Sequence, residues 1–120
     1  MKNQFNSFDI KYKLGLTLLL CILGCDVRAK DGVQKAYYKT GILKSVQSYQ
    51  NGVLKGITRE YYEVGTLKHA INYKDDRIDG MYHTYYPSGS LWTKEIYNDG
   101  VFIGRKEYNE AGEVIKEEGF

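Results

Sequence analysis

The sequence predicts an all-β protein: an antiparallel meander of β-hairpin repeats that forms a single elongated, twisted sheet, preceded by an N-terminal signal helix. The main observation is a 24-residue period, carried by Gly41, Gly65 and Gly89, by Leu43, Leu67 and Leu91, and by Tyr49, Tyr73 and Tyr97. Each period also holds two turn signals, and no stretch of the repeats keeps the apolar spacing of an amphipathic helix. Short periods of this kind indicate small units that stack because none can bury its apolar side alone.

The first 24 residues are predicted to be an export signal. Lys2, Lys11 and Lys13 make the start basic, and an apolar run covers residues 14–23. A basic start, an apolar stretch of about 7–15 residues and a small residue before the cut are typical of such signals. Ten apolar residues span only about 15 Å as a helix, roughly half of a bilayer core, so a transmembrane anchor is not expected.

Residues 22–25, Ile-Leu-Gly-Cys, resemble the lipobox of bacterial lipoproteins. The resemblance implies a lipid on Cys25 and cleavage before it, which would anchor the protein to a membrane on the periplasmic or extracytoplasmic side of the cell envelope. Residues 25–36 would then be the lipidated cysteine and a polar tether. The alternative is cleavage after Ala29, which would secrete the protein.

The predicted exported body is close to electrically neutral. Three of the 17 basic residues and one of the 15 acidic residues lie in residues 1–25, which leaves 14 of each. Proteins that bind nucleic acid concentrate basic residues, so nucleic acid is not an expected partner. The cysteines, Cys21 and Cys25, lie in or beside the leader, so the body is expected to lack disulfides and cysteine-ligated zinc.

The repeat domain, residues 37–120, is expected to divide into copies at 37–60, 61–84 and 85–107, with a partial copy at 108–120. Asn51-Gly52 and Asp99-Gly100 signal two-residue type I′ turns, and Asp75-Asp76 takes that place in the second copy. The other turn is a three-residue loop ending in glycine, as in Pro87-Ser88-Gly89. Two turns in each copy leave two strands of about 7–9 residues.

Alternation along the second strand of each copy predicts which side chains share a side. In the first copy Leu54, Gly56 and Tyr62 are expected on one side, and Ile57 and Tyr61 on the other. Stacking would then place an apolar row beside a glycine row on that first side. The apolar row is Leu54, Ile78 and Phe102, and the glycine row is Gly56, Gly80 and Gly104.

The recurring pattern Tyr-Tyr-x-x-Gly-x-Leu, then Tyr-x-x-Gly and a glycine four residues on, resembles the MORN-repeat variant of bacterial YwqK-like antitoxin proteins. The resemblance extends from Tyr37 to about Glu118. It implies a β-hairpin array that serves as an interaction module, in some cases as a toxin-neutralising antitoxin. With an export signal, the corresponding role would be an immunity lipoprotein that faces a periplasmic toxin.

An enzyme is not predicted, and neither a cofactor nor a metal is expected. His69 and His83, the only histidines, occupy non-equivalent places in different copies. No serine or cysteine of the repeats stands in a recognisable nucleophile motif. Asp75, Asp76 and Asp79 gather at one turn, but calcium needs six or more oxygens in a defined loop, so a solvated turn is expected there.

Aromatic side chains are the predicted binding surface, and a protein is the predicted partner, because tyrosine and tryptophan are enriched at interface hot spots. The residues assigned to this surface are Tyr61, Tyr62, Tyr85, Tyr86 and Trp92. The alternative is a glycan- or cell-wall-binding envelope module, in which such rings stack on sugars. A further reading is that the tyrosines only hold the sheet together.

Overall fold

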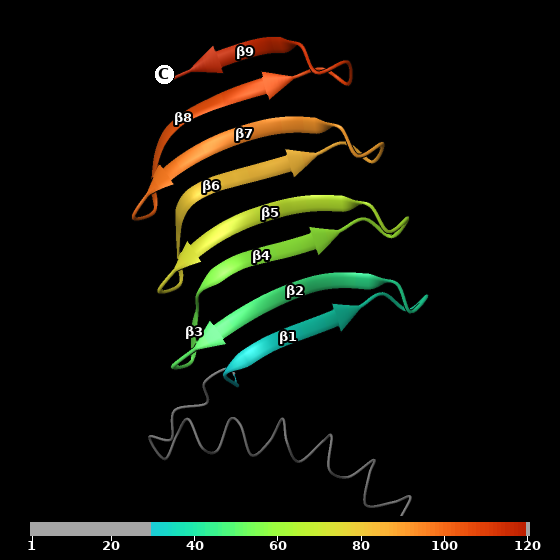
Figure 1. Cartoon of the computed structure of the whole chain (residues 1–120), viewed down its shortest axis with the longest axis vertical. Helices are drawn as coiled ribbons and strands as arrows, with labels where there is room; N and C mark the ends of the chain where they lie inside the picture. Colours follow the sequence, from blue (N-terminus) through green and yellow to red (C-terminus); the bar gives the residue numbers. More distant parts are fainter. Residues whose placement is uncertain (1–29, 120) are drawn as a thin grey trace, which may run out of the picture.

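The computed structural model describes residues 30–119. The predicted signal helix, the lipid site at Cys25 and the alternative cut after Ala29 lie outside these residues. Within them the chain forms one open antiparallel sheet, whose strands lie side by side in the order of the sequence (Figure 1). The predicted all-β meander of hairpins is therefore confirmed.

Nine strands make up the sheet of the described residues. They are β1 (Gly32–Tyr37), β2 (Leu43–Gln50), β3 (Val53–Leu54), β4 (Gly56–Tyr61), β5 (Leu67–Lys74), β6 (Arg77–Tyr85), β7 (Leu91–Asn98), β8 (Val101–Tyr108) and β9 (Val114–Glu118). The short strands β3 and β4 both pair with β2 and together correspond to β6 of the next copy.

The sheet begins earlier than the sequence predicted. Residues 32–36, expected to belong to the polar tether, form most of strand β1, which pairs with β2 from Gly32 to Tyr37. The signal was present in the sequence, since Asp31-Gly32 stands 24 residues before Lys55-Gly56. The first unit therefore includes residues assigned to the tether.

The two kinds of turn lie at opposite edges of the sheet, as Figure 1 shows. In the two-residue turns Asn51, Asp75, Asp76 and Asp99 have positive φ angles of 54°, 49°, 66° and 48°. This is the geometry of type I′ turns, whose twist matches that of the flanking strands. In the three-residue loops the glycine amide closes a turn, as where Gly65 N donates to Tyr62 O at 2.8 Å.

A β-bulge near the two-residue turn sets which side chains share a side. Tyr73 opposes Ile78 but Ile71 opposes Tyr82, so Asp79 and Gly80 are extra residues in β6. The φ of Gly80 is 101°, a region that residues with a Cβ seldom adopt. The glycine at this position therefore serves the bulge itself.

The predicted glycine row is wrong at Gly104. In the β7–β8 hairpin Tyr97 opposes Phe102 and Ile96 opposes Gly104, so Ile103 alone is extra. Gly104 consequently lies on the opposite side from Phe102 and occupies the place that Met81 has in the copy before it. The physical reason is that the third copy is one residue shorter than the second. Its bulge contains one extra residue, Ile103, where the bulge of β6 contains two.

The sheet is a single layer with almost no core. Ile71 is the buried hydrophobic residue of the described chain. Thr58, which opposes it, and Thr93, farther along the sheet, are buried polar residues. Thr58, Ile71 and Tyr82 are in register on one side of the sheet. We call this side the Tyr82 face and the opposite side, which carries the neighbouring His83, the His83 face. The Tyr82 face is the better packed of the two.

Tyrosine hydroxyls link each unit to the next along the edge with the three-residue loops. Tyr38 Oη donates to Tyr61 O at 2.6 Å, Tyr62 Oη donates to Tyr85 O at 2.8 Å, and Tyr86 Oη donates to Tyr108 O at 3.0 Å. In each Tyr-Tyr pair, therefore, the second ring is bound to the following unit, whose first tyrosine supplies the backbone acceptor.

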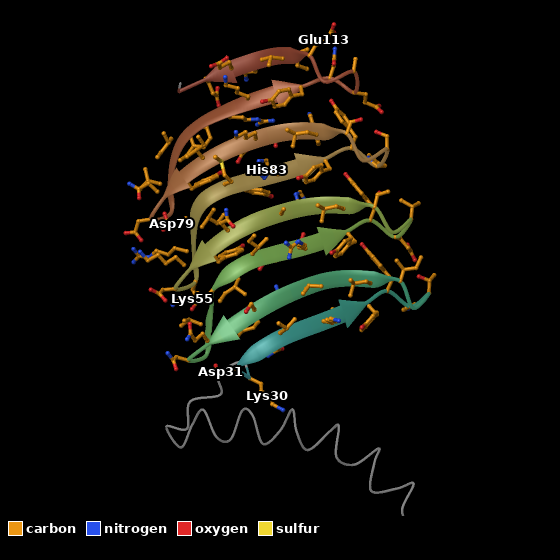
Figure 2. The ribbon with its side chains drawn as sticks, viewed as in Figure 1. Lys30, Asp31, Lys55, Asp79, His83 and Glu113 are labelled. Carbon is orange, nitrogen blue, oxygen red and sulfur yellow. The ribbon has the colours of Figure 1, made fainter. Side chains whose placement is uncertain are left out.

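Aspartates link the units along the other edge. Asp31 Oδ1 accepts from Gly52 N at 2.8 Å, and Asp79 Oδ1 accepts from Asp99 N at 3.1 Å. Asp31 and Asp79 lie along this edge in Figure 2. Since a charged acceptor makes a stronger bond to an amide than a neutral one does, these contacts stabilise the stacking of one turn on the next.

We expect Tyr62→Phe to lower the free energy of unfolding by about 1 kcal/mol, because it removes one hydrogen bond and leaves the half-buried carbonyl of Tyr85 without that donor. Tyr61→Phe is the matched control, since its backbone carbonyl, not its hydroxyl, makes the corresponding link. Urea unfolding followed by circular dichroism measures both. Equal losses in the two variants would contradict the role of the tyrosine hydroxyls.

Candidate functional site

The five residues predicted to bind a partner are divided between the two faces. Tyr61 and Tyr85 lie on the His83 face, where the rings of His83 and Tyr85 are 6.3 Å apart. Tyr62 and Tyr86 lie on the Tyr82 face, and their hydroxyls hold the following unit. The structure therefore does not gather the five residues into one patch.

Trp92 belongs with Tyr86. The two rings are stacked, with centroids 5.4 Å apart and an interplanar angle of 25°, and Trp92 Nε1 donates to Glu107 Oε1 at 3.2 Å. Trp92 remains 37% exposed, whereas the four tyrosines of the predicted set are half-buried. Of the predicted binding residues on the Tyr82 face, Trp92 is therefore the one with an exposed ring.

A polar and aromatic network runs across the Tyr82 face. His69 Nδ1 lies 3.3 Å from Thr84 Oγ1 and 3.4 Å from Tyr82 Oη. The His69 and Tyr82 rings meet edge to face with centroids 5.6 Å apart. Burial lowers the pKa of His69, and this effect exceeds the opposing influence of Glu60. His69 is therefore mainly neutral at pH 7.

The network continues through Tyr97 and two carboxylates. Tyr97 Oη donates to Glu95 Oε2 at 2.9 Å, and Arg105 lies 3.7 Å from Glu95 and 3.3 Å from Glu107. Burial, followed by the hydrogen bond and charge of Glu95, raises the pKa of Tyr97 to about 12. Burial also raises the pKa of Tyr82, with Glu95 the next cause.

These environments favour binding over reaction. Raised phenol pKa values keep Tyr82 and Tyr97 protonated near neutral pH, so they serve as hydrogen-bond donors rather than as bases. The turn aspartates are also engaged, because Asp76 Oδ1 accepts from Leu54 N at 2.7 Å. Among the described residues, no group of three or more histidine, cysteine or acidic side chains is placed to hold a metal ion.

The hollows described on the sheet are small. One, of about 130 Å³, lies between the first two units and is lined by Tyr38, Lys44, Ser45, Glu60, Tyr61 and Lys68. The other, of about 260 Å³, lies among the turn residues Lys74, Asp75, Arg77 and Asp99. Ligand pockets for small molecules usually enclose roughly 300–1,000 Å³, so the sheet faces themselves are the larger candidates for binding.

The His83 face carries a row rich in basic side chains that the sequence did not reveal. His83 itself is mainly neutral at pH 7, because burial, followed by the charge of Lys94, lowers its pKa. Register places the following residues side by side, one from each strand in turn: Lys35, Val46, Arg59, Ala70, His83, Lys94, Lys106 and Glu117. We call this the cationic row. On the Tyr82 face the adjacent row holds Glu60 and Glu107. The Tyr82 face thus carries acidic residues together with the cations Arg105 and Lys116, whereas the row on the His83 face is acidic only at Glu117.

A repeated motif explains the cationic row. In β1 the residues Val33, Lys35 and Tyr37 alternate toward the His83 face, and in β4 the residues Ile57, Arg59 and Tyr61 do the same. The next copies place Met81, His83 and Tyr85, then Gly104, Lys106 and Tyr108, at these positions. A basic residue two positions before a tyrosine thus recurs along the sheet, with an apolar side chain two positions before the basic residue in all but the last case, where Gly104 stands. The repeat was visible in the sequence once the register was known.

The fold defines the class of protein: a repeat module of β-hairpins arranged in one open antiparallel sheet. Three segments, residues 30–51, 54–75 and 78–99, match the family described as MORN repeat variant, and together they cover more than half of the 120 residues. The chain belongs to this family. Comparison with curated protein sequences gave no match.

The family supports a coarse functional statement. Its repeats generally mediate protein interaction, and the match assigns the chain to no catalytic family. In the part of the chain that the structure describes, no helix has the length and apolar character needed to cross a membrane. The family and the architecture together thus place the chain among repeat modules that generally mediate protein interaction.

We expect Tyr97 to titrate at a higher pH than an ordinary tyrosine side chain. Its pKa in the folded protein, about 12, exceeds the ordinary value of 10.0, so the folded state holds its proton more tightly than the unfolded state does. The stabilisation is complete below pH 10 and is lost as the pH rises toward 12. Glu95→Gln should shift this titration to lower pH, because it removes the negative charge.

NMR shifts of the tyrosine Cζ atoms during an alkaline titration measure the effect, with Tyr97→Phe identifying the signal. Ionisation of Tyr97 near pH 10 in the folded protein would contradict it.

Proposed function

We propose that the protein is a membrane-anchored envelope lipoprotein, tethered by a lipid on Cys25, whose repeat sheet binds a protein partner. The leader at residues 1–24 and the lipobox-like residues before Cys25 support the location. Membership of a family of interaction repeats supports the activity. No catalytic step is part of the proposal.

The observation that carries the proposal is the exposed, repetitive His83 face. Within the first two units this face displays Val33, Tyr37 and Ile57, which are 65%, 58% and 44% exposed, next to the exposed cations Lys35 and Arg59. Contiguous apolar and aromatic surface of this kind marks sites of protein interaction. A broad sheet face also suits a protein surface better than it suits a small molecule.

The form of this function that we favour is an antitoxin-like or immunity role. It rests on the resemblance to YwqK-like repeat proteins and on the predicted export of the chain, which would place the sheet where a periplasmic toxin acts. In this role the sheet neutralises its partner by covering it, so binding alone suffices.

A glycan- or cell-wall-binding module is the second candidate, and Trp92 is the observation that favours it. Its ring is exposed beside Tyr86, and such rings can stack on sugars. The equivalent positions of the other copies hold Lys44 and Lys68, which lie over the Tyr38 and Tyr62 rings at 5.7 and 5.6 Å. The stacking position is thus not repeated, and we rank this candidate second.

We expect Cys25→Ser to move the protein from the membrane fraction to the soluble fraction, because the variant cannot receive the lipid. Cell fractionation with metabolic labelling by a palmitate analogue measures both location and lipid. Cys21→Ser is the control and should keep the label. A wild-type chain without label, found in the medium and cut after Ala29, would contradict the anchor.

We expect a photo-crosslinking amino acid at Tyr61 or Tyr85 to capture one defined protein from living cells, because both positions lie on the His83 face. Val64, in a three-residue loop, is 73% exposed and serves as the control position with little or no capture. Mass spectrometry identifies the product. Equal capture at all three positions, or capture of cell-wall glycan alone, would contradict a protein partner on this face.

A further inference from the structure

The sheet of the described residues has two open edges, β1 and β9, which lie at opposite ends of the array in Figure 1. An edge strand carries N–H and C=O groups that can pair with a further strand. The strands occupy eight positions, because β3 and β4 both pair with β2. Seven spacings of about 4.8 Å put the two edges roughly 34 Å apart, so β9 cannot pair with β1 of its own chain.

Side chains at both edges are more exposed than those at the same places inside the sheet. Tyr37 on β1 is 58% exposed and Val114 on β9 is 50% exposed. The residues that hold the place of Tyr37 in later units are half-buried, and these are Tyr61, Tyr85 and Tyr108. Those that hold the place of Val114 in earlier units are also half-buried, and these are Leu43, Leu67 and Leu91. A strand added at either edge would therefore cover surface that a neighbouring strand covers elsewhere in the sheet.

A second copy of this chain offers each edge a strand of the right direction. Neighbouring strands are antiparallel throughout the sheet. Strands β1 and β9 hold the first and the last of eight positions, so they run in opposite directions. If a second copy in the same orientation places its β1 beside β9, the antiparallel order continues without interruption. We call this junction between two copies the seam.

The junctions between units inside the sheet give the register of the seam. At the β5–β6 junction Ala70 opposes His83. On β9 the place of Ala70 is held by Glu117, and on β1 the place of His83 is held by Lys35. The same register therefore sets Glu117 of one copy opposite Lys35 of the next. The positions on either side become the pairs Lys116 with Ala36 and Glu118 with Gln34.

The charges at the seam are complementary. Lys35 is exposed and forms no salt bridge with another described residue. Glu117 binds Lys106 through Oε1 at 3.2 Å, and its other oxygen can accept from Lys35 of a second copy. At the corresponding place inside the sheet, Lys94 opposes Lys106, a pair of like charges that is unfavourable between strands. The seam is thus better matched in charge at this place than a junction that the sheet already contains.

We propose that β9 of one copy pairs with β1 of a second copy, so that chains join head to tail into one longer antiparallel sheet. Each seam leaves a β1 edge at one end and a β9 edge at the other, so further copies can add. The inference concerns the edges of the sheet and does not depend on which partner binds the His83 face.

The seam lacks one of the links that hold units together inside the chain. Asn109 holds the place that Tyr86 has in the unit before it, so it has no hydroxyl to donate to the carbonyl of Tyr37 in a second copy. Its amide instead donates to Glu113 Oε2 at 2.8 Å, within its own loop. Backbone pairing and the charges of β9 and β1 therefore hold the seam, which makes assembly weaker than folding and sensitive to charge.

The test uses two full-length copies with different tags, expressed together in cells. One copy carries a diazirine analogue of lysine at Lys116, and illumination should join it to the second copy at residues 32–37, because Lys116 lies opposite Ala36 at the seam. Mass spectrometry of the digested product locates the crosslink. The same analogue at Lys74, an exposed position in a turn of the second unit, is the control and should join the two copies at least about fivefold less.

Charge exchange tests the register. Lys35→Glu in the second copy should lower the yield of this crosslink about fivefold, because repulsion from Glu117 replaces attraction. Adding Glu117→Lys to the probed copy should restore the yield, which also shows that both variants fold. Lys55→Glu, at an exposed position away from the seam, makes the same change of charge and should alter the yield less than about twofold.

Head-to-tail pairing is overturned if the crosslink joins β9 to β9, because two copies would then meet about a two-fold axis. It is also overturned if a different protein is captured at Lys116, if no second copy is captured, or if Lys35→Glu and Lys55→Glu have equal effects. None of these outcomes touches the proposed function, which is tested separately by capture at Tyr61 and Tyr85 on the His83 face.

Discussion

The fold depends on contacts between consecutive units, because a single-layer sheet has no second layer to pack against. Ile71 is the buried hydrophobic side chain of the described residues, so burial of apolar area contributes far less than in a sandwich or barrel of similar size. The backbone ladder and the side-chain links at the two edges must supply the rest. Stability in such an array is approximately a sum over units and their interfaces.

Those edge links explain much of the repeat pattern. The second tyrosine of each pair binds the carbonyl of the first tyrosine in the next unit, as between Tyr62 and Tyr85. The opposite edge uses aspartates, and there Arg77 and Asp99 add an ion pair at 3.0 Å. This pair is largely exposed, so it contributes little by itself. The repeated residues are therefore mainly those that hold neighbouring units in register.

The sequence predicted the architecture because its strongest signals are local. The type I′ turns followed from dipeptides such as Asn51-Gly52, and even Asp75-Asp76 adopts that geometry. The three-residue loops followed from their glycines in the same way. Strand β1 was missed because the first copy was taken to begin at the Tyr-Tyr pair, whereas in the structure this pair follows the strand, as Tyr37-Tyr38 follows residues 32–36.

The surface was harder to predict than the fold, and the reason is register. Tyr61 and Tyr62 are adjacent in sequence, yet they lie on opposite faces and do different things. Whether Trp92 stands with one face or the other depends on a bulge, which alternation alone does not locate. The charge pattern was hidden for the same reason, since summing charges along the chain averages Arg59 with Glu60, although the sheet separates them.

The two faces differ in how far their charged side chains are already paired within the protein. On the Tyr82 face Glu95, Arg105 and Glu107 neutralise one another, and Glu95 also accepts a hydrogen bond from Tyr97, so these charged side chains are already paired. On the His83 face the cations Lys35 and Arg59 face solvent together with aromatic and apolar side chains. A partner gains most where the protein has left its own groups without partners, which favours the His83 face.

The one-residue bulge at Ile103 has a consequence for how such proteins change length. Deleting a residue from an ordinary strand turns every later side chain over to the wrong side of the sheet. Here the shortened bulge absorbs the loss, so Lys106 and Tyr108 still point the way that His83 and Tyr85 do. The bulge of each hairpin is thus a position where a residue can be added or removed while the side chains that follow it stay on the same side of the sheet.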